Sequence, residues 1–445
     1  MKRIVLLWIA AALCAGAGAP IAAAEEQHYV GGDISMLPLY EQHNQPYKDV
    51  KGQKITNVLT WFIQDCGWNT FRVRLFVDPD KTDPSLSQDL AYVTALGKRI
   101  KDAGAFFMLD FHYSDTWVDA GHIQAPKAWK GKSDAEMAST LGQYTHDVLD
   151  ALKKAGATPD LVQVGNEIMY GLCGIKVAPY DKSDSNWPGY LGLLKAGCDA
   201  VRAECPNAQI IIHTDRPCNS GYNKYYYGKL VEGGVDFDII GLSYYPFWHA
   251  DMNPSASTTG AQLLQPLVNA VNALKKDFPT KTVHIVECAY NFQWWPTEGV
   301  NYDTRPVWAC SKAGQYSFVK DLVDALIPLD NLRGINYWFP EEAGNGDDTD
   351  WNNSKGTVLW TWQNRGFWNP ENNYGHEINR AFTPSESTLP HEVCAPYYMQ
   401  AFVRELPSGV EEVKSQESRA KKTLRDGQVI IKRNNKEYTI FGQEL

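Results

Sequence analysis

Short apolar runs recur along the chain, separated by longer segments whose apolar residues have helical spacing. Eight of these runs predict β-strands. They are Gly31–Ser35, Thr70–Phe76, Phe106–His112, Leu161–Glu167, Gln209–Thr214, Asp238–Tyr245, Thr282–Tyr290 and Arg333–Phe339. Most are continuously apolar and end in polar or aromatic residues, which is typical of parallel strands buried on both faces.

The segments between these runs predict helices. The clearest are Leu90–Ala103, Ala135–Lys154, Ala261–Lys276 and Gln315–Leu326. Gly104 and Gly156 follow the first two as stop signals. Eight alternating strand and helix units predict an α/β fold, a closed (β/α)8 TIM barrel. An open doubly wound sheet is disfavoured, because no GxGxxG motif follows the first run.

The N-terminus has the pattern of a signal peptide over residues 1–24. Lys2 and Arg3 precede the short apolar run Ile4–Leu13, and Ala22–Ala24 offers small residues for cleavage. We therefore expect an exported protein, secreted or held at the cell surface, with no transmembrane segment in the mature chain. An uncleaved membrane anchor is the alternative. Eight cysteines remain after Cys14, and their number permits disulfides without assigning pairs.

The barrel is predicted to span residues 25–406. Within it, Glu341–Pro390 is polar and aperiodic and predicts a long loop over the barrel mouth. A closing helix is expected near Ala395–Leu406. Residues 407–445 predict a charged linker or frayed helix, Glu411–Lys422, and a small hairpin made of Gln428–Lys432 and Glu437–Phe441. This tail resembles the short export or surface-sorting signals of some bacteria.

Composition narrows the possible functions. The formal net charge of -10 argues against nucleic acid as a partner. No CxxC motif or Cys/His cluster has zinc spacing, so we expect no zinc site. Asp347, Asp348 and Asp350 could hold a structural calcium ion, although a solvated acidic loop is the simpler explanation. We expect a monomer with no required cofactor. The 15 Trp and 23 Tyr include many in polar segments, where flat rings can stack on sugars.

Polar and aromatic residues stand at the ends of seven predicted strands, where a barrel carries its active site. They are Asp33, Arg74, His112, Asn166, Glu167, Tyr244 or Tyr245, Glu287 and Trp338. Two glutamates without a metal motif indicate glycoside hydrolysis. An apolar strand delivers Glu167 to a poorly solvated position, so a raised pKa would suit it as general acid. Glu287 is then the expected nucleophile of a retaining pair.

Other strand-end residues are expected to support this pair. Arg74 would favour the ionised form of Glu287, and the Tyr245 hydroxyl would donate to it. Asn166 would bind the sugar hydroxyl beside the reacting carbon. His112 is placed in the site by its position at a strand end. The expected substrate contacts are Asp33, Asp115, Trp117, Trp248 and Trp338, although Asp115 could instead cap its loop.

Six motifs together resemble glycoside hydrolase family 53, the endo-β-1,4-galactanases. They are Gly31–Ser35, Arg72–Phe76, Asp110–Trp117, Gln163–Glu167, Gly241–Trp248 and Val286–Glu287. They follow the family order from Val30 to about Leu406. The resemblance implies acid/base catalysis by Glu167, nucleophilic attack by Glu287, and cleavage inside β-1,4-galactan or arabinogalactan side chains of pectin.

The chain departs from the family pattern at Val118–Ala120, at Cys288, and in Asn291–Ser311, which lacks a calcium-binding pattern of some bacterial members. Other functions therefore stay open. One is a hydrolase of the same clan that acts on another β-1,4 glycan, such as mannan. Another is a non-catalytic carbohydrate-binding barrel, although such proteins usually lose one carboxylate. An aldolase-like barrel is disfavoured, because no predicted strand ends on a lysine.

Overall fold

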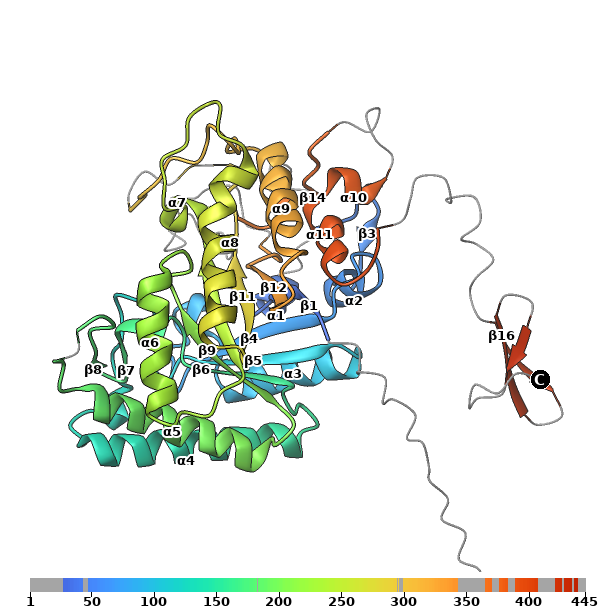
Figure 1. Cartoon of the computed structure of the whole chain (residues 1–445). Helices are drawn as coiled ribbons and strands as arrows, with labels where there is room; N and C mark the ends of the chain where they lie inside the picture. Colours follow the sequence, from blue (N-terminus) through green and yellow to red (C-terminus); the bar gives the residue numbers. More distant parts are fainter. Residues whose placement is uncertain are drawn as a thin grey trace, which may run out of the picture.

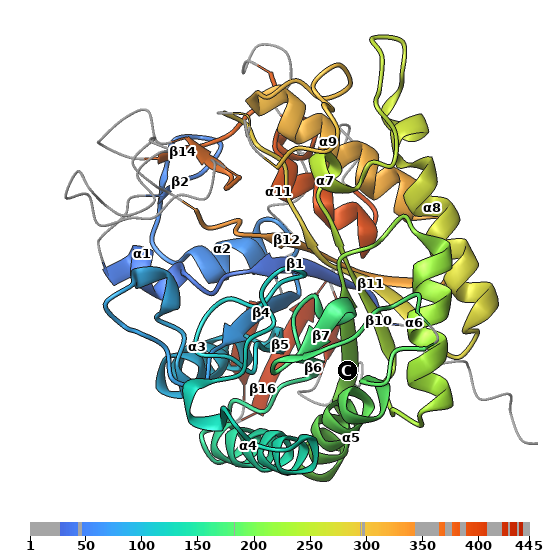
Figure 2. The same cartoon turned by 90° about the vertical axis from the view of Figure 1, so that its left-hand side faces the viewer.

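The computed structural model describes residues 27–42, 47–181, 183–293, 295, 299–342, 365–369, 376–382, 389–406, 421–425, 428–433 and 436–438. Its centre is a closed barrel in the order β1-β12-β11-β10-β9-β6-β5-β4, and neighbouring strands are parallel (Figure 1). Helices surround the barrel when it is viewed along its axis (Figure 2). The predicted (β/α)8 barrel is confirmed.

All eight predicted apolar runs are barrel strands. Their bounds are β1 (Tyr29–Asp33), β4 (Thr70–Leu75), β5 (Phe106–Phe111), β6 (Leu161–Val164), β9 (Gln209–Thr214), β10 (Ile239–Tyr244), β11 (Thr282–Cys288) and β12 (Leu332–Trp338). The largest displacement of a single strand end is at Leu161–Glu167, where the strand ends at Val164. The chain turns there because Gly165 and Glu167 have φ angles of 90° and 47°, outside the extended region.

The four predicted helices are confirmed as α3 (Leu90–Asp102), α4 (Asp134–Lys154), α8 (Gly260–Asp277) and α9 (Lys312–Leu326). Ser133 and Glu136 form a capping box that starts α4. The helix predicted near Ala395–Leu406 is shorter than expected, since α11 (Ala395–Tyr398) is one turn that continues into the 3-10 helix η4 (Met399–Phe402).

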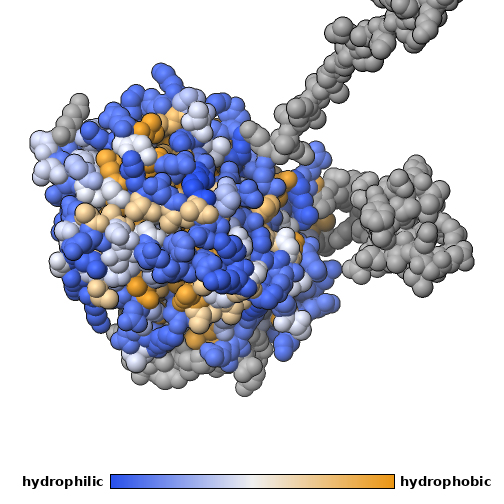
Figure 3. All heavy atoms as spheres, turned by 90° about the horizontal axis from the view of Figure 1, so that it is seen from below, coloured by the Kyte–Doolittle hydropathy of each residue, from blue (hydrophilic) through white to orange (hydrophobic). Residues whose placement is uncertain are grey.

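For the other helices the sequence predicted no bounds. They are α1 (Leu37–Gln42), α2 (Val58–Gln64), α5 (Trp187–Glu204), α6 (Ser220–Glu232), α7 (Pro246–His249) and α10 (Pro390–Val393), with 3-10 helices η1 (Pro84–Leu86), η2 (Lys127–Trp129) and η3 (Ile168–Tyr170). Figure 3 shows the molecule from the side of α4 and α5, where hydrophilic residues cover most of the surface and apolar patches are small.

The inside of the barrel is layered. Its floor is a separate apolar cluster of Tyr29, Met108, Leu161, Ile211, Ile239 and Val286. Strand side chains alternate between the two faces of the sheet, so the next inward positions lie nearer the carboxyl ends. These positions are polar and buried: Arg72, Asp110, Gln163, His213 and Ser243. The apolar floor therefore supports a polar layer just below the mouth.

Smaller sheets complete the structure. β2 (Tyr47–Lys48) and β3 (Lys54–Ile55) pair with β13 (Trp368–Asn369) and β14 (His376–Ile378) in one sheet, and β7 (Gly171–Leu172) pairs with β8 (Ile175–Lys176). The predicted loop Glu341–Pro390 thus contains two strands. Its Asp347, Asp348 and Asp350 lie outside the described residues, as does the predicted signal peptide.

The C-terminal tail forms a sheet of β15 (Lys421–Arg425), β16 (Gln428–Arg433) and β17 (Lys436–Tyr438). The predicted hairpin corresponds to the last two strands. The prediction of a linker or frayed helix is wrong for Lys421 and Lys422, which belong to β15.

The eight cysteines from Cys66 to Cys394 are free thiols, so none of them forms a disulfide in this structure. Among the described helices, none combines the length and apolarity needed to cross a bilayer.

Candidate active site

A pocket opens at the carboxyl ends of the barrel strands and contains both predicted glutamates. Its lining residues are Arg72, Arg74, His112, Trp117, Val118, Asp119, Asn166, Glu167, Tyr245, Trp248, Glu287, Trp338 and Arg365. Nine of the eleven predicted site residues are therefore in this lining, and Asp33 and Asp115 are not.

A sharp turn after β6 places Glu167 in the pocket. Gly165 has a positive φ of 90°, and a Cβ there would stand 2.6 Å from Cγ2 of Ile168. Glu167 itself adopts a left-handed conformation with φ 47° and ψ 46°. A non-glycine residue in this region costs about 1–3 kcal/mol, and such conformations cluster at active sites. The turn directs Glu167 into the mouth and starts η3 directly after it.

A β-bulge near the end of β11 places Glu287. Leu242 of β10 pairs with Ile285, but the next residue, Ser243, pairs with Glu287, so Val286 is the extra residue. Val286 packs in the apolar floor of the barrel. In regular alternation its neighbour Glu287 would face outward. The bulge breaks this alternation and directs Glu287 inward as well.

Two groups bind the Glu287 carboxylate. Arg72 Nη2 lies 2.9 Å from Oε1, and the Tyr245 hydroxyl donates to Oε2 at 2.7 Å. The Tyr245 contact agrees with the sequence-based expectation. The expected arginine was Arg74, however, and that expectation is wrong, because Arg72 makes the ion pair. Arg74 Nη1 instead lies 3.1 Å from Asp33, and its guanidinium stacks 4.4 Å above the Trp117 ring centre.

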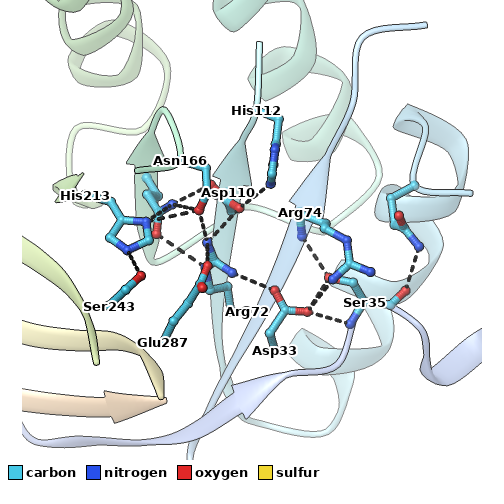
Figure 4. Close-up of polar contacts among 12 residues, drawn as sticks. Asp33, Ser35, Arg72, Arg74, Asp110, His112, Asn166, His213, Ser243 and Glu287 are labelled. Carbon is cyan, nitrogen blue, oxygen red and sulfur yellow. Dashed lines mark hydrogen bonds and ion pairs between the residues drawn. The ribbon is translucent and has the colours of Figure 1, made fainter. Parts of the chain in front are cut away.

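Arg72 is the centre of a buried polar network (Figure 4). Its Nη1 donates to Asp33 Oδ2, and its Nη2 donates to Asp110 Oδ2 and Asn166 Oδ1, each at 2.8 Å. Asp33 is fully buried, and it also accepts from Ser35. Asp33 was expected to contact substrate, but its position gives it a different role: it fixes the two arginines from below.

The hydrogen bonds around the Glu167 carboxyl come from neutral groups. Ser243 Oγ donates to Glu167 Oε1 at 2.6 Å, and His213 Nε2 lies 2.8 Å from the same Ser243 oxygen. The other ring nitrogen of His213 faces the Gln163 amide at 3.1 Å and the Glu167 backbone N–H at 3.3 Å. These donors favour the tautomer with its proton on Nε2. In that tautomer His213 donates to Ser243, and Ser243 donates to the ionised Glu167.

The same chain of contacts also suits the protonated carboxyl. Glu167 can then donate to Ser243, Ser243 to His213 Nε2, and His213 Nδ1 to Asn166 Oδ1, which lies 3.0 Å away. Burial lowers the pKa of His213 well below its usual value, and Arg72 adds to this effect. His213 therefore stays neutral while the direction of the hydrogen bonds follows the charge on Glu167.

The two glutamates have different proton affinities. Burial raises the pKa of Glu167 well above its usual value, and the negative charges of Glu287 and Asp215 raise it further. Burial also raises the pKa of Glu287, but Arg72 and the Tyr245 hydroxyl act against it. When the pair carries a single proton, that proton is therefore on Glu167, and Glu287 is the carboxyl that ionises first.

Aromatic rings form the walls. Trp117, Trp248 and Trp338 line the pocket as expected. Arg365 was not predicted, yet its buried guanidinium lies 5.1 Å from the Tyr245 ring centre and 5.5 Å from those of Trp248 and Trp338. Its backbone N–H donates to Glu342 Oε2 at 2.7 Å. The aperiodic segment after β12 thus supplies one wall.

His112 and Asp115 follow β5 and have different roles. His112 lines the pocket, accepts from the Val118 N–H at 3.0 Å, and lies 3.1 Å from Asp110. Asp115 accepts from the backbone N–H groups of Lys127 at 2.8 Å and Asp78 at 3.2 Å. Asp115 therefore caps its loop, which was the alternative considered for it, and its expected substrate contact is absent from the pocket lining.

Several residues of the site were not predicted from the sequence. They are Arg72, Asp110, Gln163, His213, Ser243 and Arg365. All but Arg365 stand at inward positions of predicted strands, so a test of alternate positions for buried polar side chains could have found them. Within the described ranges, no group of three or more His, Cys, Asp or Glu side chains could hold a metal ion.

The chain matches known proteins over most of its length. The model of glycosyl hydrolase family 53 matches residues 29–379. A probable arabinogalactan endo-beta-1,4-galactanase A of Aspergillus terreus is 33% identical over 70% of this chain and 85% of its own. An arabinogalactan endo-beta-1,4-galactanase of Cellvibrio japonicus is 31% identical over 82% of this chain and 93% of its own.

A solved structure shows the same architecture. It is the GH53 catalytic domain of Ignisphaera aggregans, with a TM-score of 0.66 and 26% sequence identity over 82% of this chain and 96% of that domain. The family model covers Glu167 and Glu287 and extends past Arg365. The chain therefore belongs to glycosyl hydrolase family 53.

Proposed function

We propose that this protein is a retaining arabinogalactan endo-β-1,4-galactanase, which cleaves internal bonds of β-1,4-galactan in pectin side chains. One observation carries the proposal. Two glutamates share one pocket, but Arg72 and Tyr245 bind Glu287, whereas only uncharged groups bind Glu167. This division matches a nucleophile and a general acid. The names of the relatives support galactan as the substrate.

The first step forms a glycosyl-enzyme. A Glu287 oxygen attacks the anomeric carbon, and the bond from that carbon to the glycosidic oxygen breaks. Glu167 gives its proton to the leaving oxygen as the bond breaks, so the departing chain leaves as a neutral alcohol. Glu167 is then ionised, and Ser243 can donate to its new negative charge.

The second step reverses these roles. A water molecule enters on the side that the departed chain has vacated. Glu167 takes a proton from it, and the oxygen attacks the anomeric carbon and displaces Glu287. Two inversions leave the product with its original β configuration. Arg72 favours the ionised form of Glu287, which is the form that attacks in the first step and is released in the second.

Galactan hydrolysis and its stereochemistry can be measured together. Incubation with linear β-1,4-galactan should release oligosaccharides, and NMR at early times should show the β anomer at the new reducing end. An initial α anomer would contradict nucleophilic attack by Glu287. Hydrolysis of β-1,4-mannan in place of galactan would instead support the same-clan alternative.

We also propose that residues 1–24 are removed during export and that the mature monomer acts outside the cytoplasm. The signal-peptide pattern supports this part of the proposal. The intact mass of the protein recovered from its producing cells, together with its elution in size-exclusion chromatography, tests both points. A retained N-terminus or a dimer mass would contradict them.

A further inference from the structure

A row of aromatic and cationic side chains lies outside the pocket lining, on segments that follow Glu167 and β9. It consists of Arg216, Tyr170, Tyr222 and Tyr180, and it is called the tyrosine row below. Tyr170 ends η3, the turn that follows Glu167, whereas Tyr222 lies in the first turn of α6. The stacking of Tyr180 on Tyr222 places the segment after β8 against α6, and Figure 1 shows β7, β8 and α6 in the same part of the molecule.

Arg216 contacts the first tyrosine of the row. Its Nε donates to the Tyr170 hydroxyl at 3.0 Å, and its guanidinium carbon lies 5.4 Å from the Tyr170 ring centre. Burial lowers the pKa of Arg216, but Asp215, the Tyr170 hydroxyl and Glu167 outweigh this effect and raise it. Arg216 is thus close enough to Glu167 to sense its charge, and its side chain is still 38% exposed.

Tyr180 and Tyr222 form the outer part of the row. Their rings stack with centres 5.0 Å apart and planes 23° apart. Tyr180 is 59% exposed, which is the largest exposure among the large apolar side chains of the described residues. Stacking on Tyr222 covers one face of Tyr180 and keeps the ring in place. Its other face is a flat, preorganised surface on which an apolar ring face could stack.

We infer that the tyrosine row binds galactosyl residues of the leaving part of the galactan chain. This inference rests on the proposed function and extends it to a second region of the substrate. The general acid protonates the oxygen of the leaving chain, so that chain departs on the side of Glu167. The axial 4-hydroxyl of galactose leaves the opposite ring face rich in C–H groups, which suits stacking on an aromatic ring.

The row should matter for polymer substrates and for sugar acceptors. An aryl β-galactobioside places no sugar on the leaving side, so it serves as the reference substrate. We expect Tyr180→Ala to lower kcat/KM on galactan relative to the aryl substrate by about 2–12-fold, from a lost stacking contact of ~0.5–1.5 kcal/mol. Transfer to added galactobiose should fall in parallel, because the acceptor occupies the same side.

Two further variants test whether stacking is the cause. Tyr180→Phe keeps the ring and should retain the ratio between the two substrates. Phe382→Ala removes another exposed aromatic, 47% exposed and in contact with Tyr316, and serves as the control. It should leave the ratio unchanged.

The outcomes separate the two proposals. An unchanged ratio in Tyr180→Ala and in a Tyr180→Ala/Tyr222→Ala double variant would overturn the tyrosine row while leaving galactanase activity in place. An equal loss on both substrates would also overturn it. If the unaltered enzyme fails to cleave galactan, the proposed function itself is wrong, and the row is then rejected with it.

Discussion

The active site contains two glutamates in different electrostatic environments, one around Glu287 and one around Glu167. Around Glu287 the barrel supplies charge: Arg72 contacts this glutamate and two buried aspartates. Around Glu167 it supplies only neutral hydrogen bonds, through Ser243 and His213. Burial raises the pKa of both carboxyls, and at Glu287 an ion pair with Arg72 opposes this effect. Environment, rather than sequence position, therefore separates nucleophile from acid.

This difference has a structural origin. Glu287 is on β11, directed inward by a bulge toward the arginine from β4. Glu167 lies after the end of β6, in a left-handed conformation, and accepts a hydrogen bond from Ser243 of β10. A strand position holds an ionised group rigidly against its partner. A turn position leaves the acid facing the space where the leaving oxygen must arrive.

The largest loss of activity is expected when each of the two glutamates is replaced in turn. Glu287→Ala should abolish hydrolysis of galactan and of aryl galactosides, because both need the nucleophile. Glu167→Ala should slow galactan hydrolysis by about 10²–10⁴-fold. It should affect formation of the glycosyl-enzyme from an aryl galactoside much less, since an acidic phenol departs without a proton. Steady-state and burst kinetics on both substrates measure this difference.

Azide provides the internal control for that pair. With Glu167→Ala, azide should attack the glycosyl-enzyme and yield a β-galactosyl azide. Equal losses on both substrates, or rescue to a β product in Glu287→Ala, would show that the two roles are assigned the wrong way round. Persistent galactan hydrolysis in Glu287→Ala would contradict the catalytic assignment altogether.

The next largest effect is expected when Arg72, the cation paired with Glu287, is removed. Arg72→Met leaves Asp33, Asp110 and Glu287 without their shared partner, and breaking such buried pairs costs about 3–5 kcal/mol. Urea denaturation measures this loss. Arg99→Met is the matched control, because its pair with Glu41 is partly exposed, and about 1 kcal/mol or less is expected.

The Arg72→Met variant should also change the pH profile. Glu287 must be ionised, so activity falls as the pH drops through its pKa. Loss of Arg72 removes an effect that lowers this pKa, and the acidic limb should therefore move to higher pH. An unmoved acidic limb would mean that Arg72 stabilises the fold without controlling the nucleophile.

The smallest expected effects concern the acid half. Glu167 must be protonated, so activity falls as the pH rises through its pKa. The Ser243 hydrogen bond lowers that pKa, and Asp215 raises it. Ser243→Ala should therefore move the alkaline limb up, and Asp215→Asn should move it down. Profiles of kcat/KM give both limbs, and movement in the same direction would contradict this account of Glu167.

Much of this site could be predicted because parallel strands buried on both faces produce apolar runs, and polar residues that interrupt their ends are conspicuous. This reasoning located Glu167, Glu287 and Tyr245. It could not choose between Arg72 and Arg74, which share one face of β4. The two arginines differ in their position along the barrel axis. That position is set by the pairing of β4 with β1 and β5, which exists only in the assembled sheet.

Other residues carried no local signal. A single histidine in the apolar run Gln209–Thr214 is usually a packed core residue, so His213 did not suggest a contact with the acid. Arg365 stands in an aperiodic segment, and only the folded chain brings it to the pocket. The bulge at Val286 was also hidden, because it exists only relative to the neighbouring strand.

The pairing of β1 with β12 closes the ring and joins residues about 300 positions apart, such as Asp33 and Trp338. Asp33 holds Arg72, and Arg72 holds Glu287, so the nucleophile depends on the first strand as well as on its own. Contacts this distant in sequence form late, because a long chain loses much entropy when its ends meet. During synthesis, earlier strands can gather in an open sheet, but the ring closes only when β12 pairs with β1, and β12 also supplies Trp338 to the pocket lining. The complete pocket therefore requires the first and the last strand of the barrel to be paired.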